Sequence, residues 1–150
     1  MVYILLGKGF EEIEAVTPGD LLRRAGVETA YVGLGGLEVT GSHGMTVRAD
    51  LTLEQMDLTQ LDMIVLPGGL GGVASIRGCR QAMEAVRFAY ENGKYVAAST
   101  GEGKLEYYAV ERTGYSVAAG KSKAVCKRGV GAKGGGDPYV AGTIPGDYWL

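Results

Sequence analysis

The chain has 150 residues, of which 46% are hydrophobic and 21% charged, a composition typical of one ordinary soluble domain spanning 1–150. Its 15 Lys and Arg against 17 Asp and Glu give a formal net charge of -2, which argues against nucleic acid or an anionic membrane surface as a partner. The apolar start at 2–6 lacks a basic leader and breaks at Gly7, and no other apolar run approaches membrane-spanning length, so we expect a cytoplasmic protein.

The first part of the chain alternates strand and helix signals. The unbroken apolar run 2–6 predicts a central parallel strand, buried on both faces. Apolar residues at helical spacing predict a helix over 12–25, which Pro18 either kinks or begins. A second strand is expected at 29–34, followed by a polar hairpin or loop at 39–47.

The same alternation continues from residue 62. A buried-type strand at 62–66 ends abruptly in the glycine-rich turn 67–72. A helix at 81–90 closes at Asn92, and 95–98 is the next strand. This order is typical of a parallel α/β sheet with right-handed crossovers, in which ligands bind outside the carboxyl ends of the strands.

The pattern weakens after residue 98. A helix at 105–112 and a strand at 123–126 are expected, whereas five glycines in 129–136 argue against regular structure there. The segment 119–122 ends like a phosphate-binding loop, but the spacing of its glycines does not fit one, so we interpret it as a surface turn.

Two cysteines, Cys79 and Cys126, lack CxxC spacing and a nearby histidine. This pattern argues against a disulfide framework and against a zinc site. Cys79 begins a predicted helix, so it is either a thiol of lowered pKa or a buried structural one. We expect reduced thiols and neither a metal nor a cofactor.

Three loops leave the carboxyl ends of predicted strands, at 7–14, 67–69 and 99–101. In a doubly wound sheet such loops gather in one crevice. Glu14 is suited to hydrogen-bond to, or exchange a proton with, a nucleophile there. It is alternatively a solvated acidic residue that stabilises a helix N-terminus together with Glu11 and Glu12.

The other candidates are backbone amides and a hydroxyl. Gly68 and Gly69 offer N–H groups suited to an oxyanion hole, or else form a tight loop that needs positive φ. Thr100 stands at a strand-to-helix turn, where a nucleophile would face a helix N-terminus. A hydroxyl needs a base, and His43, the single histidine, lies in a polar turn typical of an exposed loop.

Several motifs together resemble one family. The ThiJ/PfpI superfamily of Parkinsonism-associated deglycase-like proteins has the class I glutamine amidotransferase-like fold, and the resemblance covers nearly all of 1–98. The matching motifs are Gly9-Phe10-Glu11-Glu12-Ile13-Glu14-Ala15, Pro18, Asp20-Leu21-Leu22-Arg23-Arg24-Ala25-Gly26-Val27, Val39-Thr40-Gly41-Ser42-His43-Gly44 and Leu66-Pro67-Gly68-Gly69. The resemblance implies a flavodoxin-like three-layer sandwich with a mostly parallel sheet, and commonly a homodimer.

The resemblance also implies a site. Glu14 matches the family's protonated glutamate, and Gly68 and Gly69 match its oxyanion glycines. His43 falls where relatives often place a polar residue that approaches the partner subunit's site. The family's nucleophilic cysteine belongs at the turn after Ala98, where this chain has Thr100 and, as a further binding residue, Gly101.

The activity implied by the resemblance is glyoxalase or deglycase chemistry on small reactive aldehydes, without a cofactor. The alternative is a non-catalytic stress-response or binding dimer that has lost the nucleophilic cysteine. Two explanations of Thr100 stay open: a diverged member without the cysteine mechanism, or a sequence that departs from the natural one after Ala98. The abrupt fading of the pattern favours the second.

Overall fold

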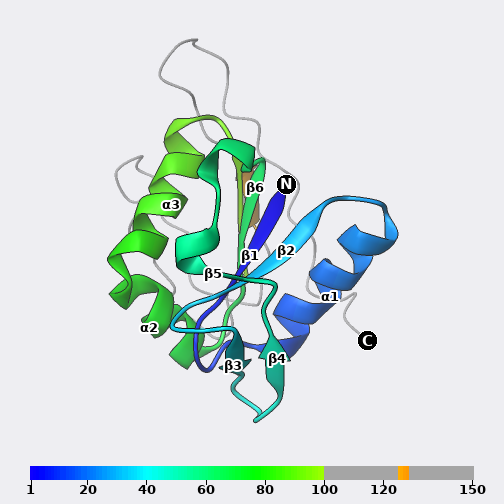
Figure 1. Cartoon of the computed structure of the whole chain (residues 1–150), viewed down its shortest axis with the longest axis vertical. Helices are drawn as coiled ribbons and strands as arrows, with labels where there is room; N and C mark the ends of the chain where they lie inside the picture. The colour runs from blue at the N-terminus through cyan, green and yellow to red at the C-terminus, as the bar shows by residue number, and fades with distance from the viewer. Residues whose placement is uncertain (100–124, 129–150) are drawn as a thin grey trace.

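The computed structural model describes residues 1–99 and the backbone of 125–128, and its main sheet has six strands (Figure 1). The strands are β1 (Val2–Leu6), β2 (Thr29–Gly33), β5 (Leu51–Thr52), β6 (Met63–Leu66), β7 (Tyr95–Ala98) and β8 (Val125–Arg128). Their order across the sheet is β5-β2-β1-β6-β7-β8. All neighbours are parallel except β7 and β8, which pair antiparallel. The expected mostly parallel sheet is confirmed.

Helices cover both faces of this sheet, as Figure 1 shows. Helix α1 (Glu12–Arg24) lies on one side, and α2 (Leu70–Gly78) and α3 (Arg80–Glu91) lie on the other. Alternate side chains of β1 explain the two apolar clusters, because successive residues of a strand point to opposite faces. Tyr3 and Leu5 join the cluster that includes residues of α2 and α3, whereas Ile4 joins the one that includes Ala15 of α1. The three-layer sandwich is therefore confirmed.

A separate two-stranded hairpin lies at the carboxyl end of β1. It consists of β3 (Glu38–Thr40) and β4 (Thr46–Arg48), which pair antiparallel, so of the hairpin and the loop expected at 39–47 the structure has the hairpin. Backbone bonds fix the hairpin to the main domain, since the amide of Gly9 donates to Thr40 at 2.8 Å and that of Ser42 donates to Phe10 at 2.8 Å. Two short 3-10 turns, Leu53–Gln55 and Leu58–Gln60, lead from β5 into β6.

The structure differs from the sequence-based expectation at two helices. Helix α1 runs through Pro18, so the alternative in which the helix begins there is wrong. The expected turn at 67–72 contains the start of α2, which includes Gly71 and Gly72. A Cβ at Gly72 would lie 2.6 Å from Cα of Phe10, so glycine serves here to let the helix approach the loop after β1.

Smaller differences concern element ends. The second strand ends at Gly33, and the strand expected at 123–126 is found at Val125–Arg128. The helix expected at 105–112 and the glycine-rich segment 129–136 lie outside the described residues. Cys79 is free and partly buried, between the end of α2 and the start of α3. None of the helices in the described ranges is long and apolar enough to cross a membrane.

Candidate functional site

The loops after β1 and β6 are joined by a reciprocal pair of hydrogen bonds. The backbone amide of Glu11 donates to the carbonyl of Gly68 at 2.9 Å, and the amide of Gly68 donates to Oε2 of Glu14 at 2.6 Å. Glu14 is partly buried and lies in the first turn of α1. The carboxyl group is therefore held at the carboxyl end of β6 by a short hydrogen bond.

The local sequence explains how Glu14 reaches this place. After β1 the chain turns within four residues, and the amide of Phe10 donates to the carbonyl of Gly7 at 3.0 Å. Gly9 has φ +80°, which favours glycine. The fully buried Phe10 side chain packs in one apolar cluster with Leu6 of β1 and Ala15 of α1, so α1 starts close to the end of β1. Its first turn then faces the loop after β6.

Two glycines shape the opposite wall. Gly69 has φ +86°, and a Cβ there would lie 2.5 Å from the carbonyl oxygen of Gly9. A Cβ at Gly68 would overlap Oε2 of Glu14 and would lie 3.2 Å from the carbonyl oxygen of Ser99. Ser99 follows β7, and its amide donates to Leu66 at 3.0 Å. The ends of β6 and β7 and the start of α1 thus meet at Gly68.

This arrangement has a specific chemical meaning. The N–H group of Gly68, which the sequence offers to an oxyanion, donates a hydrogen bond to a side-chain oxygen of Glu14. A carboxyl oxygen therefore already lies where this amide points. The site is suited to hold a carboxyl group beside the end of β7 and to move a proton at its oxygens.

A second cluster of polar groups lies beside this site, at the turn of the β3–β4 hairpin. Glu12 is buried, and its Oε1 accepts from the amide of His43 at 2.7 Å and from that of Met45 at 3.4 Å. Its Oε2 lies 3.0 Å from Nδ1 of His43 and 3.2 Å from Oγ of Ser42. Glu12 therefore links the first residue of α1 to the hairpin turn.

The contact between Glu12 and His43 shifts their pKa values in opposite directions, and each shift favours the charged form. Burial by itself would raise the pKa of Glu12, but hydrogen bonds from the side chain and backbone of His43 and from the amide of Met45 outweigh it and lower the pKa from 4.5 to about 2. The hydrogen bond to Glu12, together with the negative charge of Glu11, raises the pKa of His43. The imidazole remains exposed to solvent.

The predicted site residues therefore fall into three groups. Glu14, Gly68 and Gly69 come together with Ser99 at the carboxyl edge of the sheet. His43 lies in an exposed turn, as one interpretation of the sequence had it, and contacts Glu12. Thr100 and Gly101 lie outside the described residues, and of Cys126 only the backbone is described.

Sequence reasoning did not single out the buried role of Glu12. Its partners are 31 and 33 residues away, so no local spacing indicates the contact. The available signal was Gly41, where a Cβ would lie 2.5 Å from Oε1 of Glu12. A glycine in a polar turn is too common to predict a buried carboxylate.

Several known proteins resemble this chain in sequence and fold. The sequence profile of the DJ-1/PfpI family matches residues 1–104 of this chain. Protein dj-1beta of Drosophila melanogaster is 34% identical over 96 residues, which cover 63% of this chain and 51% of the relative. The deglycase TK1284 of Thermococcus kodakarensis is 33% identical over 97 residues, covering 65% of this chain and 58% of the relative.

The fold comparison gives the same answer. The crystal structure of Drosophila melanogaster DJ-1beta superposes with a TM-score of 0.65 at 28% identity, over 77% of this chain and 60% of that one. The chain thus spans between half and two thirds of the length of these relatives. The family match and the sandwich architecture lead to one conclusion. The chain belongs to the DJ-1/PfpI family.

Proposed function

We propose that this protein carries out cofactor-independent glyoxalase or deglycase-type chemistry on small reactive aldehydes. The observation that carries the proposal is the position of Glu14, whose Oε2 accepts the Gly68 amide at 2.6 Å. This carboxyl group lies at the end of β6, and Ser99 at the end of β7 lies next to Gly68. A nucleophile immediately after Ser99 would therefore stand close to a group able to exchange protons with it.

The proposed reaction begins with a thiolate. Its sulfur forms a bond to the aldehyde carbon, the carbonyl π bond breaks, and the electron pair moves onto the oxygen. The amides of Gly68 and Gly69 stabilise this oxyanion, and the proton that Glu14 took from the thiol when the thiolate formed passes to the oxyanion to yield a hemithioacetal. The Gly68 amide exchanges its bond to Glu14 for one to the oxyanion at this step. A cysteine at position 100 would supply the thiolate, where the chain has Thr100.

The names of the relatives support the proposal at the level of the reaction class. The Thermococcus kodakarensis relative is named a deglycase, and another protein of that name, from Pyrococcus furiosus, is 31% identical over 96 residues. The matched region contains Glu14, Gly68 and Gly69. It is also the region in which the resemblance carries over residue by residue.

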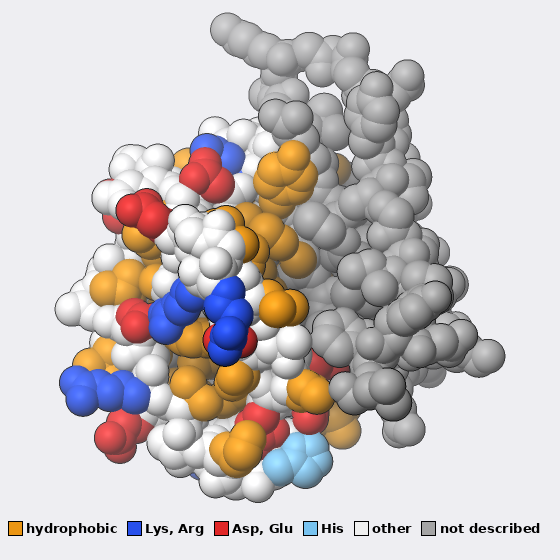
Figure 2. Space-filling model, turned by 90° about the vertical axis from the view of Figure 1, so that its right-hand side faces the viewer, with side chains coloured by type: hydrophobic (Ala, Val, Ile, Leu, Met, Phe, Trp, Pro, Cys, Tyr) orange, Lys and Arg blue, Asp and Glu red, His pale blue; other side chains and the backbone are white. Residues whose placement is uncertain are grey.

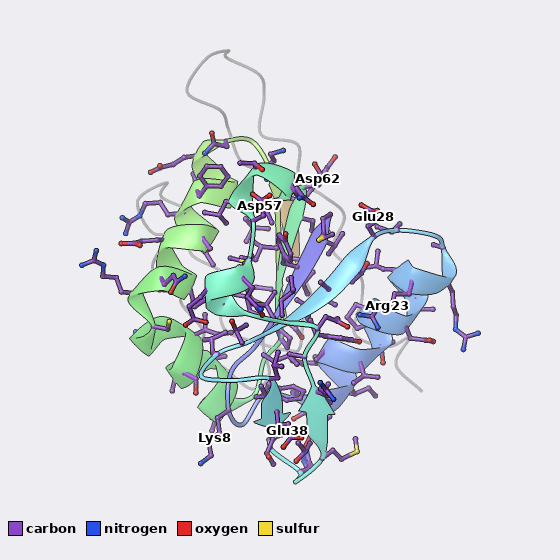
Figure 3. The ribbon with its side chains drawn as sticks, in the orientation of Figure 1. Lys8, Arg23, Glu28, Glu38, Asp57 and Asp62 are labelled. Carbon is purple, nitrogen blue, oxygen red and sulfur yellow. The ribbon has the colours of Figure 1, made fainter. Side chains whose placement is uncertain are left out.

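The test is turnover of methylglyoxal by the wild-type chain and by three variants. We expect Thr100→Cys to raise turnover at least tenfold, and Glu14→Gln in that background to remove the gain. Glu28→Gln is the matched control, because Glu28 is exposed and lies away from the hairpin (Figure 3). The proposal fails if Thr100→Cys gains nothing, or if the gain survives Glu14→Gln and alkylation of the thiols.

A second function remains, because threonine stands at the nucleophile position. In this alternative the chain is a non-catalytic binding or stress-response dimer that keeps the scaffold. An intact mass of the natural protein distinguishes the two explanations of Thr100. Agreement with the 15.7 kDa of this sequence favours the diverged member, whereas a different mass favours a natural sequence that departs after Ala98.

The proposal includes a homodimer with α1 at its interface. Ile13 and Val16, on consecutive turns of α1, are 55% and 40% exposed, and Met45 of the hairpin turn is 56% exposed. Figure 2 shows the face that carries α1, with apolar side chains distributed among charged ones.

A cytoplasmic location is also part of the proposal and rests on the two cysteines without disulfide spacing.

A further inference from the structure

The cluster at the hairpin turn places three metal-ligating atoms within reach of one ion. Nδ1 of His43 lies 3.0 Å from Oε2 of Glu12 and 3.5 Å from Oε1 of Glu11. One ligand atom from each of the three residues lies within 4.8 Å of the others. Bonds of about 2.0–2.2 Å to Zn²⁺ imply separations of about 3.3–3.6 Å between ligand atoms in a tetrahedral site. The cluster therefore needs only small side-chain shifts to surround such an ion.

The cluster has more close contacts between polar atoms than it has hydrogens to fill them. Oγ of Ser42 lies 3.0 Å from Oε2 of Glu11, 3.2 Å from Oε2 of Glu12 and 3.0 Å from Nδ1 of His43. A hydroxyl has one hydrogen, and an imidazole has one at Nδ1 at most. These two donors cannot serve all of the close contacts among the carboxylate oxygens at once. The cluster is therefore rich in acceptors, which is the condition that a metal ion relieves.

Each carboxylate has one oxygen held by the protein and one directed at the imidazole. Oε1 of Glu12 accepts the amides of His43 and Met45, while its Oε2 faces Nδ1. Oε2 of Glu11 accepts from Ser42, while its Oε1 faces Nδ1. Contacts of this kind orient metal ligands in protein sites. In this protein the amides of His43 and Met45 orient Glu12, and the hydroxyl of Ser42 orients Glu11.

The backbone holds the two segments together without help from these side chains. The amide of Ser42 donates to Phe10 at 2.8 Å, and that of Gly41 donates to Met45 at 2.9 Å. The carboxylates come from the start of α1 and the imidazole from the hairpin turn. In Figure 2 the single histidine lies at the surface with acidic side chains beside it, so an ion has access from solvent.

We propose that Glu11, Glu12 and His43 form a binding site for a divalent transition-metal ion of the Zn²⁺ class, with its remaining coordination positions open to solvent. The imidazole nitrogen selects such ions over Mg²⁺ and Ca²⁺, which prefer all-oxygen sites. The bound ion would neutralise both carboxylates and join the hairpin turn to the start of α1. The site is separate from the Glu14 carboxyl and does not depend on the proposed catalytic function.

The test uses the fact that the chain has one histidine. Its imidazole gives a single set of ¹H–¹⁵N correlations, so ZnCl₂ added to the EDTA-treated, dialysed full chain reports on His43 directly. We expect those resonances to shift or broaden up to one equivalent of zinc. Unchanged imidazole signals at saturating zinc would mean that the ion binds elsewhere, for instance at a thiol, and the proposal would be overturned.

Variants provide the second measurement, by calorimetric titration with ZnCl₂. We expect Glu11→Gln and His43→Ala to weaken binding at least tenfold, since each removes one of three ligands. Glu11→Gln leaves the buried Glu12 and its backbone bonds in place, so it preserves the fold. Glu28→Gln is the matched control and should bind as the wild type does. Equal affinities of Glu11→Gln and wild type would overturn the proposal.

Discussion

The amide of Gly68 donates to the side chain of Glu14, while the carbonyl of Gly68 accepts the amide of Glu11. The backbone N–H and the backbone carbonyl of Gly68 are thereby both used to fix the start of α1. The two distances, 2.6 Å and 2.9 Å, are those of well-formed hydrogen bonds. The position of the carboxyl group and the conformation of the loop after β6 therefore depend on each other.

The first prediction concerns the stability of this link. Glu14→Ala leaves the partly buried Gly68 amide without its acceptor, and we expect the free energy of unfolding to fall by about 1–2 kcal/mol. Glu14→Gln keeps an acceptor oxygen at the same place, so its loss should be less than half of that. Urea denaturation of both variants and the wild type provides the comparison. Equal losses would show that the hydrogen bond to Gly68 contributes nothing.

The meeting of Glu14 and Gly68 was predictable from the sequence, because both follow buried parallel strands and the carboxyl ends of such strands share one edge. The alternation of strands and helices followed from periodic patterns, whereas the layers of the sandwich were implied by the family resemblance and the segment 39–47 was left open as a hairpin or a loop. What the sequence could not give was the bond between the two residues. The amide was expected to be available to an oxyanion, and it is bonded to the carboxylate.

Two features could not be predicted because tertiary contacts decide them. The burial of Glu12 depends on amides at His43 and Met45, far along the chain, and local propensity assigns an acidic residue there to solvent. The start of α2 contains Gly71 and Gly72, which locally favour a turn. Close approach to Phe10 overrides that preference.

The second prediction uses two glycines of α2 with opposite surroundings. A Cβ at Gly72 would lie 2.6 Å from Cα of Phe10, whereas one at Gly78 would have no neighbour within 4 Å. Gly72→Ala should therefore lower the free energy of unfolding by about 2 kcal/mol, through overpacking. Gly78→Ala should raise it by about 0.5 kcal/mol, because alanine favours the helix and restricts the unfolded chain. Thermal and urea denaturation would detect the difference in sign.

The third prediction concerns acid stability of the metal-free protein. The folded-state pKa of Glu12 is about 2, below its ordinary 4.5, so the folded state favours the carboxylate. Its contribution to stability is fully present above pH 4.5 and is lost as the pH falls toward 2. The pKa of His43 is raised above 6.5, so its contribution is present below pH 6.5 and is lost as the pH rises through the folded-state value.

Urea unfolding at a series of pH values checks this prediction. The stability difference between wild type and Glu12→Gln should be largest between pH 4.5 and 6.5 and should shrink toward either side. The comparison with the variant is necessary, because Glu54, Asp57 and Asp62 also have lowered pKa values. Those three lie outside the hairpin turn and affect both proteins equally. A difference independent of pH would contradict the assignment to Glu12 and His43.

The last prediction concerns the proposed homodimer, whose interface would use the exposed apolar residues of α1. A lysine at Ile13, which is 55% exposed, would have to lose water on association, so Ile13→Lys should convert the dimer to monomer. Leu70→Lys is the matched control, because Leu70 is 82% exposed on α2, across the sheet (Figure 1). Light scattering coupled to gel filtration measures the mass directly. A wild-type monomer, or a dimer broken only by the Leu70 change, would exclude α1 as the interface.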